Sequence, residues 1–341
     1  MIKKLLLASC VALAFAGGGT AGAETVLTVS TYLPSSHPLV SVGLTNWAKQ
    51  VEEATKGEVK LRILATSLGK PEAHFDMARD GIADVTMGIP GYTPGRFKLI
   101  EVGGLPNMAN TGTGLSVGLW RTFESSEAMQ KEFDGVKPLA VFTTSPMHFF
   151  STGGEINSVQ DFKGLKARSA GGTMTEVERL LGMTPLLQPV GKSYELLSGG
   201  VADAVINPLE TVKSLKFDKL IKNALVVPGG LTASTIFVVM NPKRLDALSP
   251  ENQQALLKAS GENIARIMGE IWDTRDSEGL KSLEEAGAKV KTADAALREQ
   301  IFAVTQPVVD NWIKVAQDER GTDGLVILES LRSNIAAVEN K

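Results

Sequence analysis

Beyond residue 23, short β-branched runs alternate with segments of helical periodicity, and this alternation limits the possible folds more than any other feature of the chain. Residues 25–32 and 58–64 predict strands, the second because apolar and charged side chains alternate along it. Residues 39–55, between them, have apolar side chains near one face of a helix. Because a strand–helix–strand order is typical of parallel sheets covered by helices, we predict an α/β protein.

The alternation continues in two series. The first adds a helix over 71–80, a strand over 83–87, a loop over 88–96 and a helix over 115–133, and the second has strands over 137–143, 166–169, 204–206 and 235–241 with helices over 173–181 and 192–198. Two α/β units in series predict two domains. The chain has 341 residues, which is enough for two domains of about 100 to 200 residues each.

After residue 241 the sequence is mainly helical. Ser249-Pro250-Glu251 is a strong helix start, with a serine N-cap, a proline in the first position and an acid in the first turn. Apolar side chains then recur at helical spacing, so we predict a helix over about 250–285. Such a helix is long enough to run across both domains, although packing within one core would also explain it.

The N-terminus has the composition of an export signal. Lys3 and Lys4 precede an apolar run over 5–16, and Ala21-Gly22-Ala23 forms an A-x-A cleavage site. These three parts predict a secretory signal peptide cleaved after Ala23. The apolar run is shorter than the roughly 20 residues of a membrane-spanning helix, so we expect a soluble mature protein.

The single cysteine, Cys10, lies within this N-terminal segment. Leu7-Ala8-Ser9-Cys10 also matches a lipobox, in which the cysteine would be acylated. Most of the apolar run follows Cys10, and a signal peptide explains that order better. The mature chain would then have no cysteine and no disulfide, and an exported protein of this kind fits the periplasm of a Gram-negative bacterium.

Charge and composition narrow the range of partners. With 43% hydrophobic and 21% charged residues the chain has the composition of a globular protein. Removing residues 1–23, which include Lys3 and Lys4, takes the formal net charge from −3 to −5. Lys and Arg are scattered along the sequence, so we expect no nucleic-acid partner.

Motifs for catalysis are incomplete. The three histidines, His37, His74 and His148, are not at metal-binding spacing, and we expect no metal and no cofactor. Residues 114–118 match the G-x-S-x-G elbow around Ser116, but a polar loop precedes them where that motif needs a strand. We therefore do not predict an enzyme, and a secreted serine hydrolase using Ser116 is the alternative.

Residues 161–172 contain a cation in an apolar setting. Arg168 ends a predicted strand and is followed by small residues, including Gly171 and Gly172, which let a ligand approach the backbone closely. The planar guanidinium can bind a carboxylate through two parallel hydrogen bonds. A surface salt bridge is the alternative role for Arg168.

Several ordered segments resemble the DctP-type solute-binding proteins of TRAP transporters. They are residues 161–168, residues 200–209, Leu68-Gly69 before a helix that leads to residues 80–85, Pro106, the strand end at 239–241 and the helix start at 248–251. The resemblance covers the chain from about residue 25 to the C-terminal helices. It implies a periplasmic receptor that closes around an organic acid and delivers it to a membrane permease driven by an ion gradient. A protein that presents its ligand to a sensor is a further alternative.

The resemblance also implies a fold. The expected architecture is the two-lobed periplasmic binding protein fold, in which each lobe has a mixed, mostly parallel sheet with helices on both faces. The ligand cleft lies between the lobes, and a long helix spans both. We place residues 24–145 and 234–272 in lobe I and residues 146–233 and 273–341 in lobe II, and we expect a monomer.

Family roles transfer to particular positions. Arg168 matches the arginine that pairs with the ligand carboxylate, and Asn207 matches an asparagine whose amide contacts the ligand. The remaining positions implied to line the cleft are Tyr32, Ile89 to Tyr92, and Val190.

Two departures from the family pattern bear on the ligand. Where members often have a second cleft arginine, ungapped spacing places His148, or Met147 if one residue is missing. Where members often have Gln-Glu, this chain has Val205-Ile206. Because two buried anionic charges would need two partners, we favour a monocarboxylate with an apolar or aromatic body, such as a 2-oxo or aromatic acid. A bound water or metal could instead supply the missing polarity.

Overall fold

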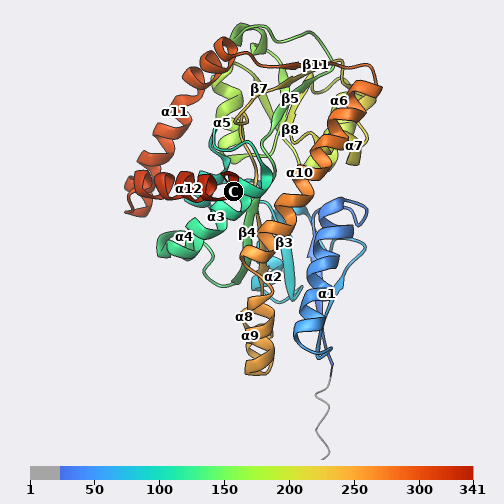
Figure 1. Cartoon of the computed structure of the whole chain (residues 1–341), viewed down its shortest axis with the longest axis vertical. Helices are drawn as coiled ribbons and strands as arrows, with labels where there is room; N and C mark the ends of the chain where they lie inside the picture. The colour runs from blue at the N-terminus through green and yellow to red at the C-terminus, as the bar shows by residue number, and fades with distance from the viewer. Residues whose placement is uncertain (1–23, 341) are drawn as a thin grey trace, which may run out of the picture.

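The computed structural model describes residues 24–340, which form two mixed β-sheets with helices packed around them (Figure 1). One sheet lies in the lower half of Figure 1 and the other in the upper half. The signal peptide, its cleavage site and Cys10 lie outside the described residues. The two-lobed α/β architecture predicted from the sequence is confirmed.

The first sheet has the strand order β2-β1-β3-β10-β4, and only β10 runs antiparallel to its neighbours. Its strands are β1 (Thr25–Thr31), β2 (Val59–Ile63), β3 (Val85–Gly88), β4 (Lys137–Thr143) and β10 (Thr235–Met240). The helices between and after these strands are α1 (Thr45–Ala54), α2 (His74–Arg79), α3 (Gly112–Ser125), α4 (Glu127–Lys131), α8 (Pro242–Asp246) and α9 (Pro250–Lys258).

The second sheet has the order β11-β9-β5-β8-β6-β7, with β5 as the reversed strand. Its strands are β5 (His148–Ser151), β6 (Lys166–Ser169), β7 (Thr184–Leu187), β8 (Ala204–Asn207), β9 (Asn223–Val226) and β11 (Lys289–Thr292). Helices α5 (Gly172–Leu180), α6 (Ser193–Ser198) and α7 (Glu210–Ser214) belong to this half, and α11 (Ala295–Arg320) and α12 (Gly324–Glu339) end the chain.

The long helix predicted over 250–285 is two helices. Ser249 caps α9 as expected, because its side chain accepts a hydrogen bond from the Asn252 amide at 3.3 Å. The chain breaks at Gly261, which has φ 61° and ψ −128°, a conformation that glycine adopts without strain. Helix α10 (Glu262–Glu285) then packs against both halves of the molecule, as Figure 1 shows, so one helix does span the two sheets.

Two other helix predictions needed correction. The segment predicted as a helix over 39–55 begins with a π-helical stretch (Leu39–Leu44) before α1. The helix predicted over 115–133 starts earlier, where Thr111 caps α3, and it is interrupted at Ser126, whose side chain caps α4. The side-chain oxygens of Thr111 and Ser126 accept hydrogen bonds from free backbone N–H groups, which explains where α3 and α4 begin.

Two strand-like connections join the sheets. The connection after β4 runs beside the connection before β10, with hydrogen bonds from the Thr144 amide to the Ser234 carbonyl and from the Met147 amide to the Thr232 carbonyl, both 2.9 Å. Helix α10 also passes between the halves, and α11 and α12 lead the chain back to the first half. The exact lobe boundaries stay a prediction; helix α12, assigned to lobe II by that prediction, packs on α3.

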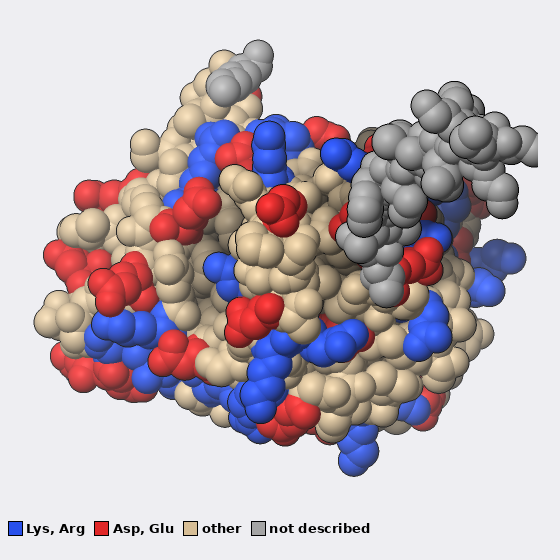
Figure 2. Space-filling view, turned by 90° about the horizontal axis from the view of Figure 1, so that it is seen from below, with Lys and Arg blue, Asp and Glu red and all other residues tan. Residues whose placement is uncertain are grey.

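No helix within residues 24–340 is both long and apolar enough to span a bilayer. On the face of the molecule in Figure 2, Lys and Arg are interspersed with Asp and Glu wherever described residues are visible. That face has no large area of a single sign. Inside the molecule, Arg168 is a buried positive charge whose hydrogen-bonding partners within residues 24–340 are uncharged groups.

Candidate ligand-binding site

A cavity lies between the two sheets, at the ends of several strands. Its walls are formed by Tyr32, Leu33, His37, Ile89, Thr144, Met147, Arg168, Ala170, Val190, Asn207, Pro208, Thr211, Ser234 and Trp272. These residues lie at or after the ends of β1, β3, β6, β7 and β8, or belong to the two connections, to α7 and to α10. Ligands in open α/β sheets bind at the carboxyl ends of strands, and this cavity has that position in both sheets.

Arg168, near the end of β6, is buried with 1% of its surface exposed. Its Nε donates to the Gln188 carbonyl at 2.8 Å, Nη1 donates to Asn207 Oδ1 at 3.3 Å, and Nη2 donates to the Tyr92 hydroxyl at 3.2 Å. A guanidinium has five N–H groups, so one N–H remains on each terminal nitrogen. Two parallel N–H groups are what a carboxylate accepts from arginine.

Asn207, the last residue of β8, adds a third donor group. Its Oδ1 accepts from Arg168, which fixes the amide so that Nδ2 is the free end. Nδ2 is buried and has no hydrogen-bonding partner among the described residues. A buried donor without a partner is costly, and an acceptor supplied by a ligand would remove that cost.

Tyr92 joins the two halves beside this cavity. It follows β3 in the first sheet, and its hydroxyl accepts from Arg168 and from the Val190 amide at 2.9 Å, both in the second half. The ring of Tyr32 meets that of Tyr92 edge-on, with centroids 5.9 Å apart. Tyr92 therefore holds Arg168 in position from behind, and its side chain is not part of the cavity wall.

The structure separates Met147 from His148. Met147 lines the cavity, whereas the imidazole of His148 accepts a hydrogen bond from the Val227 amide at 3.2 Å and is not part of the wall. Burial lowers the pKa of His148 to about 4, so the ring is neutral at pH 7. Of the two residues that the sequence offered for the second-arginine position, Met147 is the one in the cavity wall, and which of them corresponds to that arginine stays a prediction.

The remaining predicted site residues come together. Tyr32, Ile89, Val190, Arg168 and Asn207 all line the cavity. Among residues 24–340, Arg168 is the only Lys or Arg in the cavity wall. Contact of these residues with a ligand remains a prediction, but their convergence from separate segments agrees with it.

Sequence reasoning missed several lining residues, above all His37 and Trp272. His37 follows the first predicted strand by five residues, so its position after a strand end was an available signal. Trp272 lies midway along α10, within the predicted long helix, and no motif marked it as a site residue. Neither side chain could be placed in the cavity without the tertiary structure.

Glycines bring the two halves into contact beside the cavity. A Cβ built on Gly91, which follows β3, would lie 2.8 Å from the backbone oxygen of Ala170, which follows β6. Gly171 has φ +89° and would likewise clash with the Gly91 backbone if it had a side chain. The absence of side chains at both positions allows the backbones to meet.

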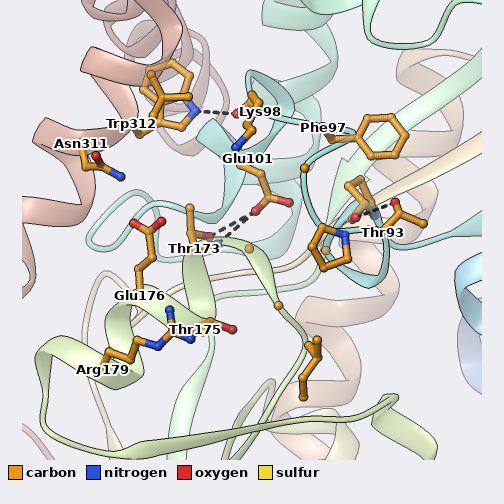
Figure 3. A pocket seen from close by; sticks show the side chains of 18 residues that line it. Thr93, Phe97, Lys98, Glu101, Thr173, Thr175, Glu176, Arg179, Asn311 and Trp312 are labelled. Carbon is orange, nitrogen blue, oxygen red and sulfur yellow. Dashed lines mark hydrogen bonds between the residues drawn. The ribbon is translucent and has the colours of Figure 1, made fainter. Parts of the chain in front are cut away.

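A larger groove lies outside this contact, between the loop after β3, the start of α5 and helix α11 (Figure 3). In it, Glu101 accepts a hydrogen bond from the Thr173 amide at 3.2 Å, and burial raises the pKa of Glu101 to about 7. Lys98 and Arg179 share the groove with Glu101 and Glu176. Because its charges are mixed, we assign the anion site to the smaller cavity around Arg168.

The structure gives no support to hydrolase chemistry at Ser116. The serine is fully buried in α3, and its hydroxyl donates to the Thr143 carbonyl at 3.1 Å. It stands within a helix, not at a strand-to-helix elbow, so the G-x-S-x-G match belongs to helix packing. Within residues 24–340, no group of three or more His, Cys, Asp or Glu residues is arranged to hold a metal ion.

Comparisons with known proteins agree with this architecture. Residues 29–315 match the family described as bacterial extracellular solute-binding protein, family 7 (DctP). The outer membrane transporter protein TsaT of Comamonas testosteroni is 28% identical over 91% of this chain and 92% of its own length.

Two solved structures are also similar. A TRAP periplasmic solute-binding protein from Bordetella bronchiseptica with bound (R)- and (S)-mandelate has a TM-score of 0.89 and 36% identity, covering 92% of this chain and 99% of that one. A marine metagenome TRAP solute-binding protein in complex with 3-hydroxybenzoate has a TM-score of 0.86 and 28% identity at the same coverage. Family and neighbours are solute receptors and not enzymes, and the chain belongs to the DctP family of TRAP transporter solute-binding proteins.

Proposed function

We propose that this receptor binds an organic monocarboxylate with an apolar or aromatic body, such as a 2-oxo or aromatic acid. The observation that carries the proposal is the set of free donors at one end of the cavity: two N–H groups of Arg168 and the Nδ2 of Asn207. A single guanidinium balances a single carboxylate. A second ligand carboxylate would be buried without a cation, which costs several kcal/mol.

The rest of the wall is mostly apolar or aromatic, with Tyr32, Leu33, Ile89, Met147 and Trp272 as its largest apolar or aromatic side chains. Such a surface favours an apolar ligand body through burial of its surface. Two similar structures, described above, contain mandelate and 3-hydroxybenzoate. Both are monocarboxylates with an aromatic ring, and this supports the same ligand class here.

Binding would act through closure of the two lobes. Arg168 and Asn207 come from the second sheet, and Tyr32 and Ile89 come from the first. A ligand that contacts both sets binds the closed form better than the open form, and this difference in affinity shifts the population toward closure. The closed receptor then differs in shape from the empty one, which allows a membrane permease to select it.

We further propose that the protein works in the periplasm as a monomer, after cleavage behind Ala23, and delivers its ligand to TRAP permease subunits. The composition of residues 1–23 and the family support this. N-terminal sequencing of protein from a periplasmic extract checks the cleavage site, and a first residue other than Glu24 would contradict it.

Calorimetric titration with aromatic and 2-oxo acids tests the site. Arg168→Ala should weaken binding of any acid that the wild type binds by about 2 to 5 kcal/mol. This is a loss of about 30- to 5,000-fold in affinity. Arg266→Ala is the control, since Arg266 pairs on the surface with Glu262 at 2.8 Å. Equal affinity of Arg168→Ala and wild type would refute the assignment.

A further inference from the structure

The cavity has two further hydrogen-bond donors besides those of Arg168 and Asn207. His37, in the loop after β1, and Trp272, in α10, both line the cavity and are 4% and 3% exposed. Their rings meet edge-on with centroids 5.8 Å apart. One comes from the first half of the molecule and the other from the helix that spans both halves, whereas Arg168 and Asn207 belong to the second sheet.

Neither donor has an acceptor within hydrogen-bonding distance in the described part of the chain. The Nδ1 of His37 accepts from the Leu39 amide at 3.3 Å, so the proton of a neutral ring is on Nε2. Burial lowers the pKa of His37 to about 4, so the ring is neutral at pH 7. Nε2 lies 3.7 Å from the nearest oxygen of Glu210, which is too far for a hydrogen bond. The indole N–H of Trp272 is buried and has no partner among the described residues.

The surroundings limit which group could satisfy these donors. Two neutral N–H groups can bind an uncharged oxygen but give no positive charge to balance a carboxylate. Glu210, next to His37, would repel a second anion when ionised. A hydroxyl or oxo oxygen meets both conditions because it accepts hydrogen bonds and carries no charge.

We propose that the ligand has, besides its carboxylate, a hydroxyl or oxo oxygen that binds between His37 Nε2 and Trp272 Nε1. This inference rests on the proposed function and narrows it to hydroxy or oxo monocarboxylic acids. The carboxylate is held by the second sheet and the neutral oxygen by the first half and α10. The two groups together therefore tie the lobes to each other, and an acid without the second oxygen leaves two buried donors unpaired.

Pairs of acids that differ by one oxygen test this inference. We would titrate wild-type protein with benzoate and the three hydroxybenzoates, with phenylacetate and mandelate, and with 3-phenylpropionate and phenylpyruvate. For at least one pair, the oxygenated acid should bind about 10-fold or more tightly. Trp272→Phe and His37→Phe remove one donor each while keeping a ring. Each variant should bring the ratio of the affinities for the oxygenated and the plain acid closer to one.

Trp47 provides a matched control. Its indole N–H is also buried and has no hydrogen-bonding partner within residues 24–340, but Trp47 packs in the core of the first half and does not line the cavity. Trp47→Phe should leave the preference unchanged, and melting curves of all three variants check folding. The inference would be overturned if the wild type bound the oxygenated and the plain acid of every pair equally well. It would also be overturned if the preference for the oxygenated acid remained in both Trp272→Phe and His37→Phe. Either outcome would leave the proposed carboxylate site intact. If no carboxylic acid binds, the proposed function fails as well.

Discussion

Closure of the lobes depends on Gly91, and the substitution Gly91→Ala should block it. Gly91 and Ala170 lie at corresponding strand ends of the two sheets. A Cβ on Gly91 would be 2.8 Å from the Ala170 backbone oxygen, closer than side-chain carbons approach such atoms. Because the obstacle is backbone, a rotamer change cannot relieve the clash. Only separation of the lobes at this contact can do so.

The size of the effect follows from the cost of overpacking, which is typically about 1 to 3 kcal/mol. The clash exists only when the lobes are closed, so the cost falls on the closed state. Ligand affinity should therefore drop by about 5- to 150-fold. Gly91 is not among the glycines with positive φ, so alanine fits its backbone conformation and the variant should fold with a nearly unchanged melting temperature in the absence of ligand.

Calorimetry and small-angle X-ray scattering measure the two consequences. Gly91→Ala should bind the ligand weakly, and its radius of gyration at saturating ligand should exceed that of the liganded wild type. Gly154→Ala is the control because a Cβ there would meet no atom within 4 Å. Wild-type affinity together with a wild-type radius for liganded Gly91→Ala would refute the claim that this contact closes the lobes.

Two further predictions concern the Tyr92 hydroxyl and the buried acids. Tyr92→Phe removes the hydroxyl that accepts hydrogen bonds from Arg168 and from the Val190 amide. Calorimetry should then show that ligand binding is weaker by about 1 to 3 kcal/mol, and an unchanged affinity would contradict the role of Tyr92 in holding Arg168. Burial raises the pKa of Glu178 to about 8 and the pKa values of Glu210 and Asp276 to about 7. Between about pH 6.5 and 8 the folded state keeps protons on these acids that the unfolded state has lost, so stability should fall as pH rises through 7 and 8. Below about pH 6.5 the buried His37 and His148, whose pKa values burial lowers to about 4, act in the opposite direction. Melting temperatures from about pH 6.5 to 8 check this, Glu178→Gln should flatten the slope, and a rising melting temperature over that range would contradict it.

The sequence predicted best the elements that have a strong local signal. Strands β4 and β6 were predicted with their observed bounds, and β10 to within one residue. Strands β5, β7, β9 and β11, of four residues each, were missed. Of these, β7 and β11 are the two edge strands of the second sheet and are only partly buried, whereas the equally short β6 and β8, which were predicted, are mostly buried. The break at Gly261 was also missed, since a single glycine is tolerated within many helical patterns.

The site was predicted unevenly for a similar reason. Arg168 and Asn207 were identified through ordered motifs along the chain. In the structure Arg168 Nη1 lies 3.3 Å from Asn207 Oδ1, although the two residues are 39 positions apart in the sequence. His37 and Trp272 have no such motif. Their place in the cavity depends on how the first loop packs against α10, which is a tertiary contact that no local pattern records.

A protein that is acidic overall can bind an acid because the charge of Arg168 is left without a counterion. All three hydrogen-bonding partners of Arg168 are neutral: a backbone carbonyl, an amide oxygen and a phenol hydroxyl. The nearby acid Glu178 is fully buried, and burial raises its pKa to about 8, so it is mostly protonated at pH 7 and does not neutralise the guanidinium. The buried cation is therefore a cost to the empty protein. A ligand carboxylate offsets that cost because it pairs with the charge, and this pairing supplies part of the binding affinity. Ligand binding should therefore stabilise the folded protein, and the stabilisation should grow with the affinity of the ligand.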